Sequence, residues 1–405
     1  MVELVADRGY AGVTIRALVR TSEVSTSAFY RQFPDIEECF ASTYRTILQR
    51  VRRQLQEVTV AGRRREDRLR ALVRAALIAA AQNPHAARLV LVDCYDGGPA
   101  MLREIETETA QLEQQLEEDP AALPRPIGQA VVAGIEYVVR VKVLGGREEQ
   151  LPAIADELAD WVVRVAQIEL RPEPQSMVEV KERHHGDTPR DPGFAAFTAI
   201  GGDRGRVLAA VAKLSADGGY WNLTLPVVRR EAGVSRRNFD ALFADLDHSY
   251  LEAVATVSAA AARAVVEETD ETLPWASRLD ELAKRFCDEV SRSPLLARLA
   301  FADVFAPGSA GLRCRDRLLA WSTRLLRTVS LSDQLRAGIA PDAAVAGAWR
   351  VLAAEIQTGA PPRRSSAPLM SELVLASTDF STEPPIYRER ERTDPRTSQS
   401  GARAR

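Results

Sequence analysis

Apolar residues recur at the spacing of an α-helix along most of the chain, and two short helices are predicted between residues 14 and 33. Each has one apolar side and one polar side. The first helix buries Ile15, Leu18 and Val19, and the second buries Ala28, Phe29 and Phe33. Thr14 and Ser25 precede the two helices and are suitable N-caps, because a hydroxyl there can accept a backbone N–H of the first turn.

The short turn between these helices predicts a helix-turn-helix, with Val24 placed to plug the angle between them. Such a pair can lay its second helix in the major groove of DNA, where small polar residues allow close approach and arginine reaches bases or phosphates. The outward positions carry side chains of this kind: Arg16, Arg20, Thr26, Ser27, Tyr30 and Arg31. The alternative is two packed helices of an all-α protein that contact no DNA.

The pattern returns 210 residues later. Thr14 corresponds to Thr224, Val24-Ser25 to Val234-Ser235, and Phe29 to Phe239. Pro226 falls in the first turn of its helix, where the missing N–H costs nothing. The second copy has its own candidates for DNA contact, namely Thr224, Arg229, Ser235, Arg236, Arg237 and Asn238.

The rest of the sequence repeats as well. Ala87-Arg88-Leu89 matches Ala297-Arg298-Leu299 at the same offset, and Asp93 matches Asp303. Further along, three extra residues change the offset to 213, so that Ala133-Gly134 falls on Ala346-Gly347. The chain is therefore predicted to be a head-to-tail duplication.

These landmarks resemble the tetracycline-repressor (TetR) family of bacterial transcription regulators. The resemblance rests on Gly9-Tyr10, Thr14, Val24-Ser25, Phe29-Tyr30 and Phe33-Pro34, and on the Ala232-Gly233-Val234-Ser235 turn of the second copy. The chain departs from the family pattern at four positions: Glu23 replaces a turn glycine, Asp240 a tyrosine, and Ile36 and Leu246 a lysine. The resemblance implies a DNA-binding, ligand-responsive repressor that acts on a double-stranded operator.

The fold expected is all-α, with two TetR-like units joined by a Pro-rich linker. Each unit has an N-terminal three-helix domain with a helix-turn-helix and a helical body for ligand binding and dimerisation. The expected boundaries are a first DNA-binding domain at 1–45, its body at 46–170, a linker at 171–200 that holds His184 and His185, a second DNA-binding domain at 201–255, its body at 256–377 and a disordered tail at 378–405. The Arg63-Arg64-Arg65 run predicts a solvated connection.

The first helix of the first copy is predicted to be short, because its counterpart starts near Asp203. Either the first copy has lost about two turns or the true start codon lies upstream. A shortened helix would remove buried contacts and loosen the first helix-turn-helix.

Two apolar late helices, Ile127 to Leu144 and Leu151 to Leu170, are typical of a dimerising four-helix bundle. We expect residues 127–170 to pack against residues 341–377, which would make the chain a monomeric pseudo-dimer; a homodimer is the alternative. Because the exposed residues of the two recognition helices differ, the operator is expected to be asymmetric.

Ligand pockets are expected by resemblance within 66–145 and 274–355. The candidate lining residues are Asp93, Tyr95, Glu136 and Tyr137 in the first body, and Phe286, Phe301, Phe305 and Trp321 in the second. The polar candidates could equally face solvent or satisfy core hydrogen bonds, and the aromatic candidates are equally typical of an ordinary core.

Composition narrows the function further. The net charge is −3, and residues 1–56 hold eight Arg and six acids, an excess of +2, so DNA affinity must depend on geometry and a few arginines. Buried thiols rather than a zinc site or disulfides are expected for Cys39, Cys94, Cys287 and Cys314, which lie far apart. We expect no metal and no cofactor.

Membrane spans and signal peptides are not expected, because no apolar run reaches the necessary length, and a cytoplasmic location follows. Motifs of nucleophilic, P-loop or zinc enzymes are also missing from the sequence, so an enzyme is not expected. The remaining alternative is a ligand-sensing or protein-interaction module whose helix-turn-helix units no longer bind DNA.

Overall fold

The computed structural model describes residues 1–58, 64–118, 123–170, 193–330, 335, 338–357 and 366–378. Within these residues every regular element is helical, apart from an isolated antiparallel bridge between Leu335 and Thr378. The predicted all-α fold is therefore confirmed. Arg63, the stretch with His184 and His185, and the tail from residue 379 lie outside the described residues.

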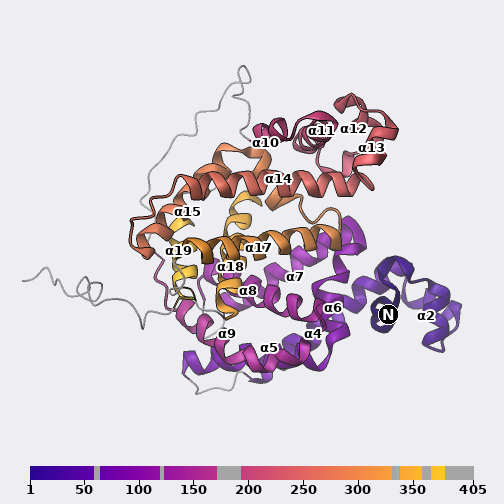
Figure 1. Cartoon of the computed structure of the whole chain (residues 1–405). Helices are drawn as coiled ribbons and strands as arrows, with labels where there is room; N and C mark the ends of the chain where they lie inside the picture. Colours follow the sequence, from indigo (N-terminus) through magenta and orange to yellow (C-terminus); the bar gives the residue numbers. More distant parts are fainter. Residues whose placement is uncertain are drawn as a thin grey trace, which may run out of the picture.

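Unit one, residues 1–170, has a three-helix N-terminal domain and a helical body (Figure 1). The first three helices, which we call the first head, are α1 (Val2–Arg8), α2 (Ile15–Thr21) and α3 (Thr26–Gln32), with the 3-10 turn η1 (Tyr10–Gly12) after α1. The body contains α4 (Ile36–Val58), α5 (Arg65–Gln82), α6 (Pro84–Leu91), η2 (Asp93–Gly97), α7 (Gly98–Glu118), α8 (Arg125–Leu144), η3 (Glu148–Gln150) and α9 (Leu151–Val165). The last helix ends five residues before the predicted Leu170.

Unit two, residues 193–378, repeats this order. Its second head consists of α11 (Gly202–Gly218), η4 (Tyr220–Asn222), α12 (Leu225–Ala232) and α13 (Arg236–Leu242). Its body contains α14 (Leu246–Glu267), α15 (Trp275–Arg292), α16 (Pro294–Ala297), the π-helical turn η5 (Arg298–Ala302), α17 (Ser309–Val329), α18 (Ala340–Gln357) and α19 (Ser366–Leu375). The two heads project from the same end of the molecule, on the right in Figure 1.

One helix, α10 (Gly193–Ile200), falls where the sequence predicted linker. It packs on α11 and α14, and Phe197 is only 1% exposed. The prediction of linker through residue 200 was therefore wrong for residues 193–200. This segment is too short to show a helical period and has almost no polar face, yet its phenylalanines bury enough apolar surface to fix it.

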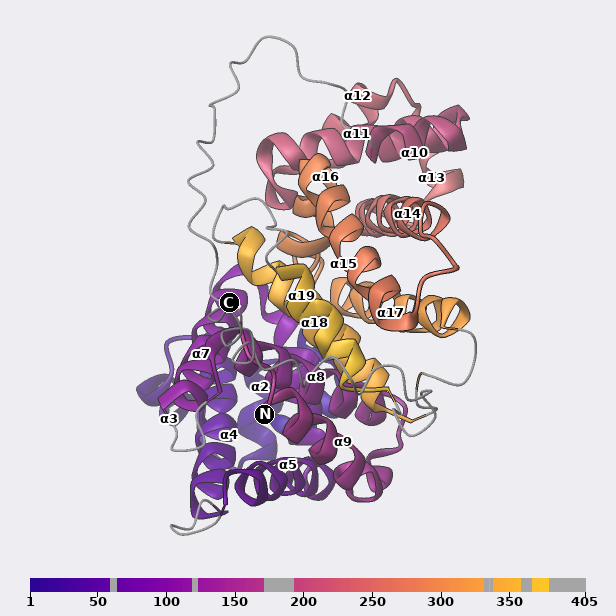
Figure 2. The same ribbon diagram turned by 90° about the vertical axis from the view of Figure 1, so that its left-hand side faces the viewer.

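The two units meet where α8 crosses α18, at the centre of Figure 2. A β-carbon on Gly134 would lie 2.8 Å from the carbonyl oxygen of Ala343, and one on Gly347 would lie 2.8 Å from that of Ala130. Under the 213-residue offset, Ala130 corresponds to Ala343 and Gly134 to Gly347. Each contact is thus the counterpart of the other, which is the reciprocity of a two-fold interface.

Polar contacts reinforce this interface. Arg140 of α8 is buried and forms a two-pronged ion pair with Asp316 of α17, at 2.7 and 3.1 Å. At the start of α18, the Glu157 carboxylate accepts the backbone N–H groups of Ile339 and Ala340 at 2.6 and 3.0 Å. A helix N-terminus favours negative charge, so Glu157 of α9 stabilises α18 of the other unit.

The first helices of the two heads differ in length. Because Val2 corresponds to Ala212, α11 extends ten residues further towards its N-terminus than α1. The longer α11 packs along α12, whereas α1 packs on η1 and α6. Val234 in the second head is buried at 6% exposure, but Val24 is 45% exposed. The prediction that Val24 plugs the angle between the helices was therefore wrong, since α1 packs on η1 and α6 and leaves Val24 uncovered.

This difference predicts unequal responses to one substitution. Val234→Ala should destabilise the second head by about 1–3 kcal/mol through lost burial and a residual cavity. Val24→Ala, the matched control, should change the first head by less than about 0.5 kcal/mol. Hydrogen exchange of the amides in α12–α13 and α2–α3 measures each head separately. Equal effects in the two heads would contradict the packing difference.

The sequence was expected to contain no apolar segment long enough to span a membrane, but α14 is one by length and composition. In this structure α14 packs against α11, α15 and α17, and buries Tyr250, Val254 and Val257. A core helix meets the same criteria, and these contacts identify α14 as one.

Candidate functional site

The first head presents the polar surface that the sequence predicted. Thr14 caps α2 by accepting the Ala17 N–H at 3.2 Å, and Ser25 caps α3 by accepting the Ala28 N–H at 3.1 Å. Phe29 is buried, and its ring contacts Phe33 beneath α3. The predicted outward residues are all exposed, namely Arg16, Arg20, Thr26, Ser27, Tyr30 and Arg31. Their contact with DNA stays a prediction.

The turn of the first head is strained. Glu23 has a φ of 56°, in the left-handed region that favours glycine, and the corresponding Gly233 has a φ of 63°. A side chain in this region costs on the order of 1 kcal/mol. The substitution noted in the sequence therefore leaves the turn geometry intact but lowers its stability.

The first residues of α13 in the second head differ in how far other side chains hold them. Ser235 caps α13 by accepting the Asn238 N–H at 3.1 Å. The Asn238 amide donates to Asp203 of α11 at 2.7 Å, and Arg236 lies 3.5 Å from Asp240. Arg237 is exposed and makes no ion pair within the described part of the chain. Among the predicted residues of α13, Arg237 is thus the cation best placed for a partner outside the protein.

Two other predicted residues of the second head lie in less open positions. Arg229 is half-buried in α12, and its Nε atom is buried without a hydrogen-bond partner. Thr224 is exposed at the start of α12, but its side chain accepts no capping hydrogen bond. Neither is oriented as favourably as Thr14 and Arg16 of the first head.

Each head is tied to its body by the same pair of side chains. Arg88 donates to the carbonyl oxygen of Ala6 at 3.3 Å and lies 3.4 Å from Asp93. At the equivalent positions, Arg298 donates to the carbonyl oxygen of Ala216 at 3.0 Å and pairs with Asp303 at 3.1 Å. An arginine thus connects an aspartate of each body to the first helix of its head.

A groove of about 1180 Å³ lies between the units rather than within either body. We call it the inter-unit groove; α7 and α8 line it from unit one, and residues 302–306 and α17–α19 line it from unit two. Of the predicted ligand residues, Tyr95, Glu136 and Phe305 line it, and the Tyr95 and Phe305 ring centroids are 5.1 Å apart. The others are not part of its wall: Asp93, Tyr137, Phe286, Phe301 and Trp321. Their ligand role stays a prediction.

This groove lies where the two bodies meet, so it is a different space from the pockets expected within residues 66–145 and 274–355, which stay a prediction. Its wall needs residues of both units, because the space arises where the bodies meet. Asp93, Tyr137 and Phe301 are buried side chains of the bodies, and Asp93 is occupied by Arg88. The sequence reasoning also missed Trp221, Arg315 and Trp349, which line the groove. Trp349 could have been found from the sequence, because it corresponds under the 213-residue offset to Glu136, which was already a candidate lining residue.

The charged residues of the groove wall are mostly paired. Arg350 bonds to Glu113 at 2.7 Å, and Arg315 bonds to Asp316 at 2.6 Å. Glu136, half-buried in the wall, forms no hydrogen bond or ion pair within the described ranges. Burial raises the pKa of its carboxyl above the ordinary value, against the opposing effect of nearby arginines. Glu106 of the wall also has no hydrogen bond or ion pair in these ranges but is exposed, so Glu136 is the half-buried carboxylate of the groove that no side chain of the described ranges bonds to.

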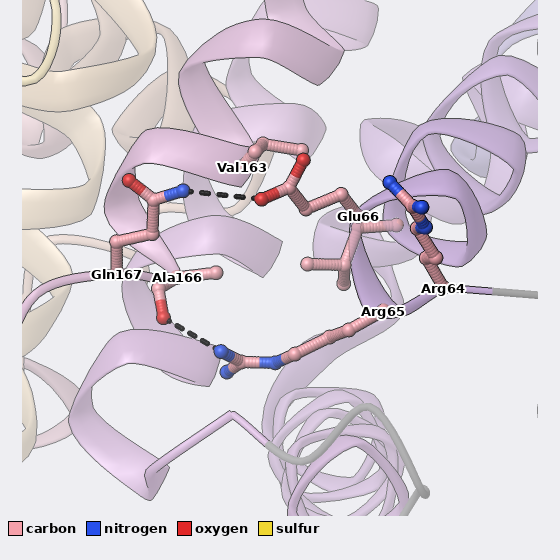
Figure 3. A pocket seen from close by; sticks show the side chains of 7 residues that line it. Arg64, Arg65, Glu66, Val163, Ala166 and Gln167 are labelled. Atoms are coloured by element: carbon pink, nitrogen blue, oxygen red, sulfur yellow. Dashed lines mark hydrogen bonds between the residues drawn. The ribbon is translucent and has the colours of Figure 1, made fainter.

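A smaller hollow of about 230 Å³ lies between α5 and the end of α9 (Figure 3). Arg65 donates to the carbonyl oxygen of Ala166 at 3.1 Å, and Gln167 donates to Glu66 at 3.3 Å. Both bonds hold α5 against α9. Arg64 and Arg65 are both exposed, as the predicted solvated connection implies, although Arg65 is already the first residue of α5.

The cysteines show the buried, free-thiol state that the sequence predicted. Burial raises the pKa of the Cys287 thiol to about 12, so this thiol stays protonated near neutral pH. No group of three histidine, cysteine or acidic side chains in the described segments is arranged to hold a metal ion.

Comparison with known proteins adds one finding to this geometry. Residues 2–43 match the family model described as bacterial regulatory proteins, tetR family. The match extends from α1 into α4, so it covers the whole first head, including α3 with its Ser25 cap and exposed polar residues. A search of curated proteins found no match.

Proposed function

We propose that the chain is a transcription regulator that binds double-stranded DNA as a covalent pseudo-dimer, with one head on each half of the operator. The observation that carries this proposal is the reciprocal contact of Gly134 and Gly347 with the opposite helix. It relates the two units as the subunits of a two-fold dimer are related. The family match of residues 2–43 and the position of both heads at one end of the molecule support it (Figure 1).

The operator in this proposal has unlike half-sites. Ser27 of the first head corresponds to Arg237 of the second, and Thr26 corresponds to Arg236, so the two helices offer different groups to the bases. Half-sites are then separated by about 34 Å or a multiple of it, one turn of the double helix. Repression relieved by a small molecule is the mode of action that the family resemblance favours.

A second function is favoured by a specific observation. The first head has a strained turn at Glu23 and an exposed Val24, and both lower the stability of the helix-turn-helix that would bind DNA. The alternative is therefore a ligand-sensing or protein-interaction module whose heads have lost DNA binding.

Selecting bound sequences from random double-stranded DNA distinguishes the two. We expect an asymmetric site with two different half-sites about one helical turn apart. Arg237→Ala should weaken binding about tenfold and relax selection at the second half-site only. Arg31→Ala should do the same at the first half-site.

The matched control is Arg324→Ala, which removes an exposed arginine from α17 of the body and should leave the selected site unchanged. Light scattering on the same sample should report a single chain. A palindromic site bound by a stable dimer of chains would contradict the pseudo-dimer. No enrichment at low salt, unchanged by Arg237→Ala, would favour the sensing module.

A further inference from the structure

The inter-unit groove has an acid on one side of the pseudo-two-fold axis and a ring on the other. Glu136 of α8 and Trp349 of α18 correspond under the 213-residue offset, and both line the groove. In a dimer of identical chains, positions related by the two-fold axis carry the same residue. The fused chain instead combines one carboxylate with one indole, which makes a single asymmetric site.

The carboxylate side of this site calls for a hydrogen-bond donor. The arginines nearest to Glu136 are already occupied: Arg140 and Arg315 by Asp316, and Arg350 by Glu113. The charges of these arginines compensate only part of the hydration that Glu136 loses on burial, because its pKa is still raised. A protonated amine compensates best, because hydrogen bonds between oppositely charged groups are about twice as strong as neutral ones.

The opposite side of the site is aromatic. The Trp349 ring stacks on Phe301 with centroids 5.5 Å apart and meets Phe305 edge-on at 5.9 Å. Phe305 in turn contacts Tyr95 of unit one, and the Arg315 guanidinium, which Asp316 holds, lies over the Trp349 and Phe305 rings at 5.1 and 5.2 Å, so that a ligand meets the edges of these two rings. A groove of about 1180 Å³ is at the upper end of small-molecule sites. A flat molecule of several fused rings suits this wall and volume.

The groove also reaches the second head directly. Trp221, which lies in η4 of the second head and is 55% exposed, is part of its wall. Asp303 is part of the wall as well, and it holds the Arg298 side chain that donates to the end of α11. The equivalent residues of unit one, Ala11 and Asp93, do not line it.

We infer that the inter-unit groove is a single binding site for a polycyclic aromatic amine, and that its occupation alters the second head but not the first. The ammonium group pairs with Glu136 while the rings lie against Trp349 and Phe305. The regulatory part rests on the proposed function, whereas binding of the amine does not.

Binding is tested with three probes on one ring system: 9-anthracenylmethylammonium, the neutral 9-anthracenemethanol and the anionic 9-anthracenecarboxylate. Anthracene absorbs where tryptophan emits, so binding near Trp221 and Trp349 quenches their fluorescence. We expect one ammonium probe per chain, bound at least about tenfold more tightly than the alcohol. Glu136→Gln should abolish that preference and leave alcohol binding within about twofold, since only the charge is removed.

A second variant tests the contact with the rings separately from the contact with the Glu136 carboxylate. Trp349→Leu should weaken the ammonium and the alcohol alike. Two probes per chain, equal affinity for ammonium and alcohol in the unaltered protein, or a preference that survives Glu136→Gln would each overturn the inference.

The coupling is tested by hydrogen exchange, which requires no DNA. The ammonium probe should change exchange at residues 220–232 of the second head and leave residues 10–21 of the first head unchanged. Arg298→Gln and, separately, the exposed-site variant Trp221→Ala should reduce that change while the probe still binds. Arg88→Gln is the matched control in unit one and should have no effect on it. Equal changes in both heads, or none in either, would overturn the regulatory part; loss of operator selection alone would instead count against the proposed function.

Discussion

Asp316→Ala is expected to lower the free energy of unfolding by about 3–5 kcal/mol. The substitution leaves Arg140 buried at 2% exposure without its carboxylate, and it also removes the partner of the buried Arg315. An uncompensated buried cation loses its hydration and gains nothing in return. Denaturant unfolding followed by circular dichroism measures the change.

The matched control is the exposed pair of Arg74 and Asp156, which joins α5 to α9 at 2.7 Å. Asp156→Ala should leave the free energy of unfolding almost unchanged, because water solvates both groups of this pair. The double variant Arg140→Met with Asp316→Leu should recover most of the loss, since neither charge then remains buried. A single Asp316→Ala variant as stable as Asp156→Ala would contradict a strong buried pair.

The same pair gives the protein a dependence on acid. Burial alone would raise the pKa of Asp316, but Arg140 and Arg315 outweigh burial and lower it below the ordinary value. A carboxyl whose pKa is lowered by folding contributes stability that is present above its unfolded pKa of about 3.9 and is lost as pH falls through the folded pKa. In Asp316→Ala, the free energy of unfolding should therefore fall less steeply as the pH is lowered through the acid range than it does in the unaltered protein.

Gly134→Ala and Gly347→Ala are each expected to destabilise the protein by about 1–3 kcal/mol through overpacking. This result would reverse the usual rule, since alanine in place of glycine inside a helix stabilises by about 1 kcal/mol. The added β-carbons would press on the carbonyl oxygens of Ala343 and Ala130 at 2.8 Å, and backbone atoms cannot move aside as a flexible side chain can.

Gly128→Ala in the same helix α8 is the control. Its β-carbon would meet its nearest neighbours at 3.9 Å, an ordinary contact, so this variant should be neutral or more stable. Unfolding of the three variants under the same conditions provides the comparison. If Gly134→Ala and Gly347→Ala are stabilised as Gly128→Ala is, the close crossing of α8 and α18 is wrong.

The sequence could predict the helices and caps because their determinants are local. Thr14 and Ser25 cap the helices that they precede, and the fixed offsets identified Gly134 and Gly347 as equivalent before their contact was known. The exposure of Val24 could not be predicted, because it depends on contacts with the first helix of the head, which is distant from Val24 in the sequence.

The groove was missed for a related reason. Its wall is assembled from both units, so no periodicity within either unit indicates it. Glu136 was identified as polar and Phe305 as aromatic, but their assignment to a common space required the packing angle of α8 on α18. Helix 193–200 was not predicted because almost all its residues are apolar. Without alternating polar residues, the sequence shows no helical period.

The crossing of α8 and α18 also bears on how such a chain can change during evolution. In a homodimer every mutation occurs in both subunits, so a harmful substitution at the axis carries a doubled energetic penalty. In this chain Gly134 and Gly347 are separate codons, and Glu136 can vary without any alteration at Trp349. Under the proposed function, single mutations can therefore change the ligand or operator preference of one unit alone, each with half the energetic penalty.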